Sequence, residues 1–194
     1  MISKKQLEIF RSYPVIASVR SAEDCERALD SKVKVLFMVG GDYFKQATYI
    51  KPLHEKGGLM LIYLDLIGGI GKNADGIDYA IHHDHIDGIL SAKGHIVKMA
   101  ENANLIAVSR IFMTDKLALL NGLKLADDLS PDFIELTPGL MPRLVKSVHN
   151  QTGIPIITSG FISKPSDVKT MLAAGAVNIA SSTSELWGKL TVNN

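Results

Sequence analysis

The sequence predicts an α/β fold, a compact (β/α)8 barrel of the TIM type in which residues 1–194 form a single domain. Short apolar runs alternate with segments of helical spacing eight times, which leaves about 24 residues for each strand, helix and pair of loops. The runs show little polar alternation, as is typical of parallel strands buried on both faces. Each run ends near Gly, Ser, Thr or a lone charge, as strands do at the functional rim of this barrel. A doubly wound open sheet is the alternative, because the pattern does not force closure.

The composition fits one soluble globular domain with a large core, since 46% of the residues are hydrophobic and the mean hydropathy is +0.16. The formal net charge of +1 gives no global basic excess, so any contact with nucleic acid must come from a local patch. Cys25 is the only cysteine, which excludes an internal disulfide. The first residues do not resemble a signal peptide, and no stretch reaches the ~18 apolar residues of a membrane helix. We therefore expect a cytoplasmic protein with no membrane partner.

The first half of the chain predicts an amphipathic helix and then four strand-to-helix units. The helix covers residues 2–10, where Leu7 and Phe10 can turn inward. The strands are expected at 14–19, 35–39, 59–64 and 88–90, and the helices at 22–31, 43–55, 76–82 and up to about 102.

The second half predicts strands at 105–111, 132–136, 154–158 and 176–180, with helices that include 116–127 and 165–173. Alternation along the fifth strand places Ile106, Val108 and Arg110 on one face, so that Arg110 stands at the top of an otherwise apolar face. In the sixth strand, Glu135 interrupts an apolar run.

The last two strands predict a phosphate site. One opens into Ser159-Gly160 and the other into Ser181-Ser182-Thr183. In an eight-stranded barrel the loops after the seventh and eighth strands form the usual phosphate site, because free N–H groups and the positive end of a helix dipole favour an anion. The alternative is that the Ser and Thr residues only cap the last helix.

Polar residues at the ends of other strands belong to the same rim. They are Arg20, Asp42, Asp65, Lys93, Arg110 and Glu135. Arg110 and Lys93 can bind a phosphate, whereas Asp65 and Glu135 can hold hydroxyl groups or act as general acid and base. The alternative for Arg110 and Glu135 is a buried ion pair that closes the top of the barrel.

Two other polar stretches are weaker candidates. The run His82-His83-Asp84-His85 precedes the fourth strand and so belongs to the opposite rim, and we expect no metal site there. The stretch Gly68-Gly69-Ile70-Gly71-Lys72 lacks the ending of a Walker motif. It is interpreted as a mobile loop over the mouth of the barrel.

Several blocks of the sequence resemble one family, the glycerol-3-phosphate-responsive antiterminators of bacterial glycerol-uptake operons. The blocks read LDLIGGIGKNADGIDYA, DGILSAKGHIVKMA, SRIFMTDK, PDFIELTPGLMPRLVK and AGAVNIASSTSELW. The resemblance implies a barrel that needs no cofactor, takes glycerol 3-phosphate as its ligand and binds the leader of a messenger RNA. Carried over by position, it implies a ligand site formed by Asp65, Lys93, Arg110, Glu135, Ser159, Gly160, Ser182 and Thr183, with no catalytic residue.

The residues themselves give little direct indication of an RNA partner. The basic residues in question are scattered along the sequence: Lys72, Arg143, Lys146, Lys164 and Lys169. Such residues more often form the solvated face of a helix than an RNA-binding patch. Our hypothesis is that the ligand orders the loop of residues 68–73 and that the ordered form binds RNA better. Two other functions stay open: a barrel enzyme acting on a small phosphorylated polyol, and a family member that binds its ligand without RNA. A homo-oligomer is equally compatible with the sequence.

Overall fold

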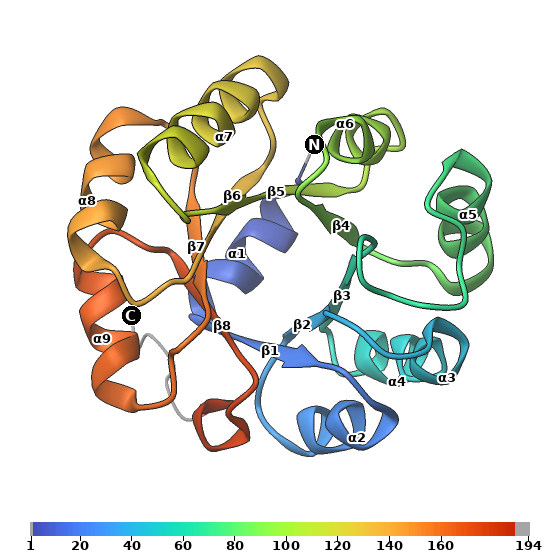
Figure 1. The fold of residues 1–194 in the computed structure, drawn as a ribbon. Coiled ribbons are helices and arrows are strands. Elements are labelled where there is room, and N and C mark those ends of the chain that lie inside the picture. Colours follow the sequence, from blue (N-terminus) through green and yellow to red (C-terminus); the bar gives the residue numbers. More distant parts are fainter. Residues whose placement is uncertain (1, 189–194) are drawn as a thin grey trace.

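The computed structural model describes residues 2–188 and shows a closed barrel of eight parallel strands (Figure 1). The strands are β1 (Val15–Val19), β2 (Val35–Met38), β3 (Leu59–Tyr63), β4 (Gly88–Ser91), β5 (Ile106–Phe112), β6 (Phe133–Thr137), β7 (Ile156–Ser159) and β8 (Asn178–Ser181). Each strand pairs with the next along the chain, and β8 pairs with β1, where Ala180 lies beside Ile16. The predicted barrel is therefore confirmed, and the open sheet is excluded.

The helices surround the strands in a ring, except α1, which lies across one end of the barrel (Figure 1). They are α1 (Lys4–Ser12), α2 (Ala22–Asp30), α3 (Tyr43–Ala47), α4 (Ile50–Glu55), α5 (Ala74–Tyr79), the π-helix η1 (Ala80–Asp84), α6 (Gly94–Asn102), α7 (Lys116–Leu129), α8 (Pro142–Gln151), α9 (Pro165–Ala173) and the 3-10 helix η2 (Ser184–Leu186).

The strands are apolar throughout because both of their faces are buried. Along β1, Ile16 belongs to the cluster inside the barrel, whereas Val15 and Ala17 belong to the layer between strands and helices. The same alternation places Ile106 and Val108 of β5 inside the barrel, as predicted.

Helix α1 closes the amino-terminal end of the barrel. Phe10 of this helix is buried inside the barrel, with its ring centroid 4.5 Å from that of Phe133. The Asn178 side chain of β8 donates hydrogen bonds to the carbonyls of Phe10 and Tyr13. Ser3 and Gln6 form a capping box that fixes the start of the helix. The inward turn of Phe10 predicted from the sequence is confirmed.

Most expected elements differ from the observed bounds by one or two residues, and three differences are structurally informative. The helix expected at 43–55 is divided into α3 and α4, because Pro52 has no N–H group to bond the carbonyl of Thr48. Strand β7 begins at Ile156 rather than at residue 154, since Pro155 cannot donate to the ladder. The helix expected at 76–82 begins at Ala74 and passes into the π-turn η1, which ends at His85 with a φ of 58°.

No helix within residues 2–188 is long and apolar enough to cross a membrane.

Candidate functional site

A cavity of about 180 Å³ opens at the carboxyl ends of the strands, where the inward side of the barrel becomes polar. Polar side chains from five strands or their following loops face it, with several apolar residues between them. The lining residues are Ser18, Arg20, Val39, Leu66, Arg110, Thr137, Ser159, Gly160, Phe161, Ile162, Ala180, Ser181 and Ser182. A site in this place matches the functional rim of the barrel fold.

Arg110 reaches the cavity from β5 and is held by Glu135 of the neighbouring strand β6. Its Nε and Nη2 donate to the two carboxylate oxygens of Glu135, over 2.6 and 2.7 Å. The guanidinium also lies over the Tyr63 ring, 4.1 Å from its centroid. Glu135 is fully buried, so it serves to fix Arg110 rather than to face the cavity itself. The ion pair weighed in the sequence analysis is present, and one member of it lines the site.

The environment keeps Arg110 charged and Tyr63 neutral. Burial lowers the pKa of the Arg110 guanidinium, but Glu135 and Tyr63 raise it by more, so the net pKa lies above its usual value. Burial raises the pKa of the Tyr63 phenol, and Arg110 opposes this only in part. The cavity thus contains a guanidinium that stays protonated at every physiological pH and whose charge is compensated by Glu135.

The turns after β7 and β8 add backbone donors to the same cavity. Gly160 has a φ of 89°, a conformation that favours glycine. Within residues 2–188, the N–H groups of Gly160 and Ser182 have no protein acceptor. Thr183 differs, since its N–H donates to the Ser181 hydroxyl, which donates in turn to the carbonyl of Ile162. Free N–H groups beside a guanidinium suit an anion such as a phosphate ester.

Asp65 and Lys93 form a second polar group on the β3 and β4 side of the rim. One oxygen of Asp65 accepts from the Ser91 hydroxyl and the Ala92 N–H, both at 2.8 Å. The other oxygen, Oδ1, is buried, lies 3.7 Å from the Lys93 ammonium and has no hydrogen bond within the described chain. This oxygen is thus an acceptor on the rim that the described residues leave unsatisfied, although it is not exposed and lies outside the lining of the cavity.

The structure brings half of the predicted site residues into the cavity. Arg110, Ser159, Gly160 and Ser182 line it, whereas Glu135 lies behind Arg110. Asp65, Lys93 and Thr183 are outside the lining but on the same rim. Ser18, Thr137 and Phe161 also line the cavity and were not predicted; the lone Ser in the apolar run PVIASV was a usable clue to the first.

The two weaker candidate stretches lie away from the cavity or at its edge. Asp84 of the His-rich run accepts a hydrogen bond from the Tyr43 hydroxyl, and the ring of His83 stacks on that of Tyr79. No cluster of three or more metal-binding side chains occurs in residues 2–188. Gly68 exchanges backbone hydrogen bonds with Gly41 and Tyr43, which ties the start of the glycine-rich loop to the β2 side of the rim.

Comparison with known proteins finds relatives with the same fold. The solved structure of a glycerol uptake operon antiterminator regulatory protein from Listeria monocytogenes is 27% identical, with a TM-score of 0.83, over 91% of this chain and 95% of that one. A related protein from Thermotoga maritima is 21% identical with a TM-score of 0.77, over 91% of this chain and 98% of that one, and shows the fold. The protein YgcP of Escherichia coli K12 is 26% identical over 93% of this chain and 95% of its own length.

The sequence profile of one family spans nearly the whole barrel, from residue 15 to residue 187, and thus includes every strand that contributes to the cavity. The chain belongs to the glycerol-3-phosphate responsive antiterminator family.

Proposed function

We propose that this protein is a cytoplasmic sensor of glycerol 3-phosphate that binds the leader of a messenger RNA and regulates transcription termination. The observation that supports the ligand is the meeting of the Arg110 guanidinium with the free N–H groups of Gly160 and Ser182 in one small cavity. Family membership supports both the ligand and antitermination. Regulation of glycerol uptake is named for the similar Listeria protein and is part of the proposal for this chain.

In this proposal the phosphate lies against the turns after β7 and β8. The N–H groups of Gly160 and Ser182 donate to its oxygens, and the hydroxyls of Ser159 and Thr183 are near enough in the chain to add donors. Arg110 adds guanidinium N–H groups that Glu135 does not engage. Both oxygens of Glu135 are engaged by Arg110, so Glu135 positions that residue rather than binding the glycerol.

The glycerol hydroxyls have a matching acceptor on the other side of the rim. Asp65 Oδ1 is buried without a hydrogen bond in the described chain, and Lys93 lies beside it. A hydroxyl that donates to Asp65 would remove this unsatisfied acceptor, which favours a polyol phosphate over inorganic phosphate.

Calorimetry with glycerol 3-phosphate, glycerol and inorganic phosphate tests the proposal. We expect the intact ligand to bind and the glycerol half alone not to bind. Arg110→Ala should abolish binding, whereas Arg143→Ala, which removes an exposed cation outside the cavity, should leave it unchanged. Absence of binding to the wild type at about millimolar ligand, a concentration at which even a weak site is detected, would refute the sensor.

The enzyme alternative rests on the Asp65 and Lys93 pair, which places a carboxylate and an ammonium 3.7 Å apart beside the cavity. Turnover of glycerol 3-phosphate or a related phosphorylated polyol, lost in Asp65→Asn, would favour it. The third function, ligand binding without RNA, is favoured if calorimetry succeeds and no RNA binds.

A further inference from the structure

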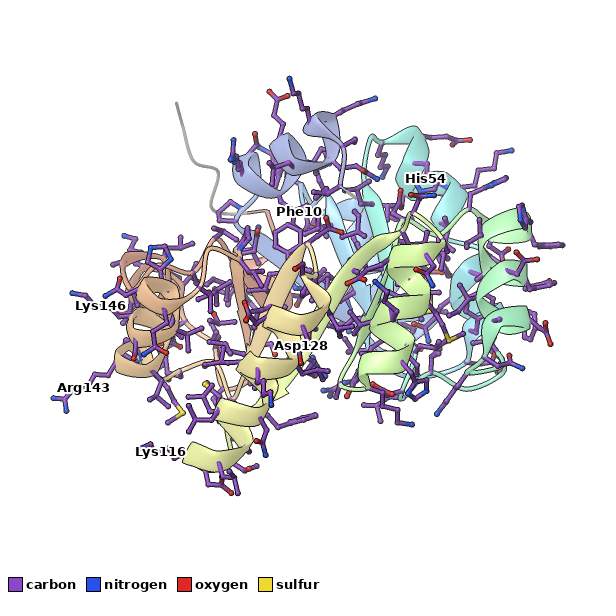
Figure 2. The ribbon with its side chains drawn as sticks, turned by 90° about the horizontal axis from the view of Figure 1, so that it is seen from above. Phe10, His54, Lys116, Asp128, Arg143 and Lys146 are labelled. Carbon is purple, nitrogen blue, oxygen red and sulfur yellow. The ribbon has the colours of Figure 1, made fainter. Side chains whose placement is uncertain are left out.

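Each of the first seven strands is followed by a Lys or Arg in the loop or in the first turn of the next helix. In chain order these residues are Arg20, Lys45, Lys72, Lys93, Lys116, Arg143 and Lys164. They are far apart in the sequence, but the barrel topology brings them all to the end at which the cavity opens, and all of them are exposed. Figure 2 shows Lys116 and Arg143 at the end of the barrel opposite to Phe10. We call this end the mouth face.

These cations do not stabilise the helices on which they lie. A helix start has a positive dipole end that favours acidic residues, yet α6 and α8 have none in their first turn, and α3 and α7 have only their capping residues Asp42 and Asp115. Lys116 is the first residue of α7, and Arg143 is the second residue of α8. At the opposite end of the barrel, Lys56 donates to the carbonyl of Leu29 at the end of α2, which is the favourable arrangement. The mouth face thus concentrates positive charge at a cost to local stability.

The acidic residues of the mouth face form few direct ion pairs with these cations, because several cap helix starts instead. Asp42 accepts from the N–H of Lys45, Asp115 from that of Ala118, and Asp167 from that of Lys164. Within the described chain, only Lys93 among these cations has an ion-pair partner, Asp65, at 3.7 Å. A polyanion approaching the mouth face would meet cations with little competition.

Exposed aromatic rings lie among the cations. Phe161 follows Gly160, is 82% exposed and has a φ of 61°, which is strained for a bulky side chain. Phe112 at the end of β5 is 46% exposed, and Phe44 at the start of α3 is 52% exposed. A strained, exposed ring beside a ligand pocket has no packing role, and such backbone outliers concentrate at functional sites.

We propose that the mouth face is the surface on which single-stranded RNA lies, with bases stacked on Phe44, Phe112 and Phe161 and phosphates contacting the surrounding cations. Aromatic rings between Lys and Arg residues are the usual platform for single strands. The inference rests on the proposed function and deepens it, because the RNA would cover the opening of the ligand cavity. Phe161 is bonded directly to Gly160, so a ligand that engages the Gly160 N–H would also set the orientation of a base-stacking ring.

The test uses a fluorescein-labelled single-stranded RNA of about 20 nucleotides, with anisotropy measured between about 50 and 200 mM KCl, both without ligand and with about millimolar glycerol 3-phosphate. The first variant is Lys116→Glu/Arg143→Glu. Its matched control is Lys4→Glu/Lys5→Glu on α1, at the other end of the barrel, with the same change of charge. A second variant, Phe161→Asn, removes the ring and places a residue that tolerates the left-handed region. Its control is Leu120→Asn, which replaces an exposed apolar residue on the side of α7.

We expect the first variant to lose at least about tenfold in affinity and to show a salt slope smaller by roughly 1 to 2, as removal of two phosphate contacts requires. Phe161→Asn should lose about fivefold or more, the effect of one stacked base. Both controls should stay within about twofold of the wild type. The glutamates lie at helix starts, so the first variant should unfold at the same temperature as the wild type or higher.

The outcomes distinguish failure of the proposed RNA-binding surface from failure of the proposed function. RNA binding by the wild type that none of the mouth-face variants weakens, or that both controls weaken equally, overturns the inference and leaves the proposed function in place. No RNA binding by the wild type overturns both. If light scattering shows that the mouth-face variants dissociate a wild-type oligomer while RNA affinity is unchanged, the face is a protein contact and the inference is wrong.

Discussion

At the scale of single residues, the pair formed by Arg110 and Glu135 links the stability of the barrel to its site. Arg110 lines the cavity, and Glu135 occupies a fully buried position in which an unpaired carboxylate would be costly. The geometry of two short hydrogen bonds fixes the guanidinium plane, so the position of the positive charge is set before a ligand arrives.

Substitution of this pair should separate folding from binding. Arg110→Ala leaves the Glu135 charge unpaired and should lower the free energy of unfolding by about 3 to 5 kcal/mol. The double variant Arg110→Met/Glu135→Leu should recover most of that loss, because replacement of a buried pair by apolar residues is often neutral to within about 1 kcal/mol or stabilising.

Urea unfolding and calorimetry on the same samples measure both quantities. The double variant should be folded and unable to bind glycerol 3-phosphate. A folded double variant that still binds the ligand would show that Arg110 has only a structural role.

At the scale of elements, α1 fills the amino-terminal end of the barrel, where the side chains of the strands do not close the core. The inward positions of β6 and β8 there are Phe133 and Asn178, and α1 meets both. Asn178 is fully buried, and its amide satisfies carbonyls at the end of α1 that the helix itself leaves free. The helix therefore belongs to the core although it precedes the first strand.

Phe10→Ala should accordingly cost about 3 to 5 kcal/mol of unfolding free energy, the range for removal of a buried aromatic side chain. Glu8→Ala, an exposed change on the same helix, should stay within about 0.5 kcal/mol of the wild type. Phe10 contacts Phe133 at the start of β6, whereas Thr137 at the end of β6 lines the cavity, so the ligand affinity of folded Phe10→Ala should be unchanged. Equal stability of the two variants would mean that α1 is not part of the cooperative core.

At the scale of the whole molecule, the sequence allowed the fold to be predicted far better than the site. The barrel was predicted from apolar runs such as LMLIYL, which indicate parallel strands buried on both faces, and their eightfold recurrence favoured a barrel over an open sheet without forcing closure. The rim residues Arg110, Ser159, Gly160 and Ser182 were found because they end strands, and the ends of parallel strands meet on one rim. Ser18 and Thr137 were missed because which side of a strand they face depends on register, which the sequence does not specify.

The basic residues also show why a surface site is harder to predict from the sequence than the fold. Lys72, Arg143 and Lys164 are scattered along the sequence and gather on the mouth face only through the topology, whereas Lys146 and Lys169 stay on the flanks of α8 and α9. Spacing within one helix predicts a patch on that helix, but a patch assembled from successive loops has no local pattern.

A closed ring of strands should also unfold as one unit. Trp187, the only tryptophan, is buried after β8 and donates to the carbonyl of Ser181, so its fluorescence reports the junction of β8 with β1. We expect the urea transition followed by this fluorescence to coincide with the one followed by far-ultraviolet circular dichroism, as in a two-state domain. A fluorescence midpoint at clearly lower urea would show that the junction opens before the remaining strands separate.

The pairing of β1 with β8 also bears on when the protein becomes active during its synthesis. Ser18 and Ser182, on opposite sides of that pairing, line one cavity, although translation produces them at nearly opposite ends of the described chain. A nascent chain on the ribosome has no complete cavity until β8 has emerged and closed the ring, however many earlier strands have already paired. Under the proposed function, incomplete chains therefore bind no ligand, and only finished molecules respond to glycerol 3-phosphate.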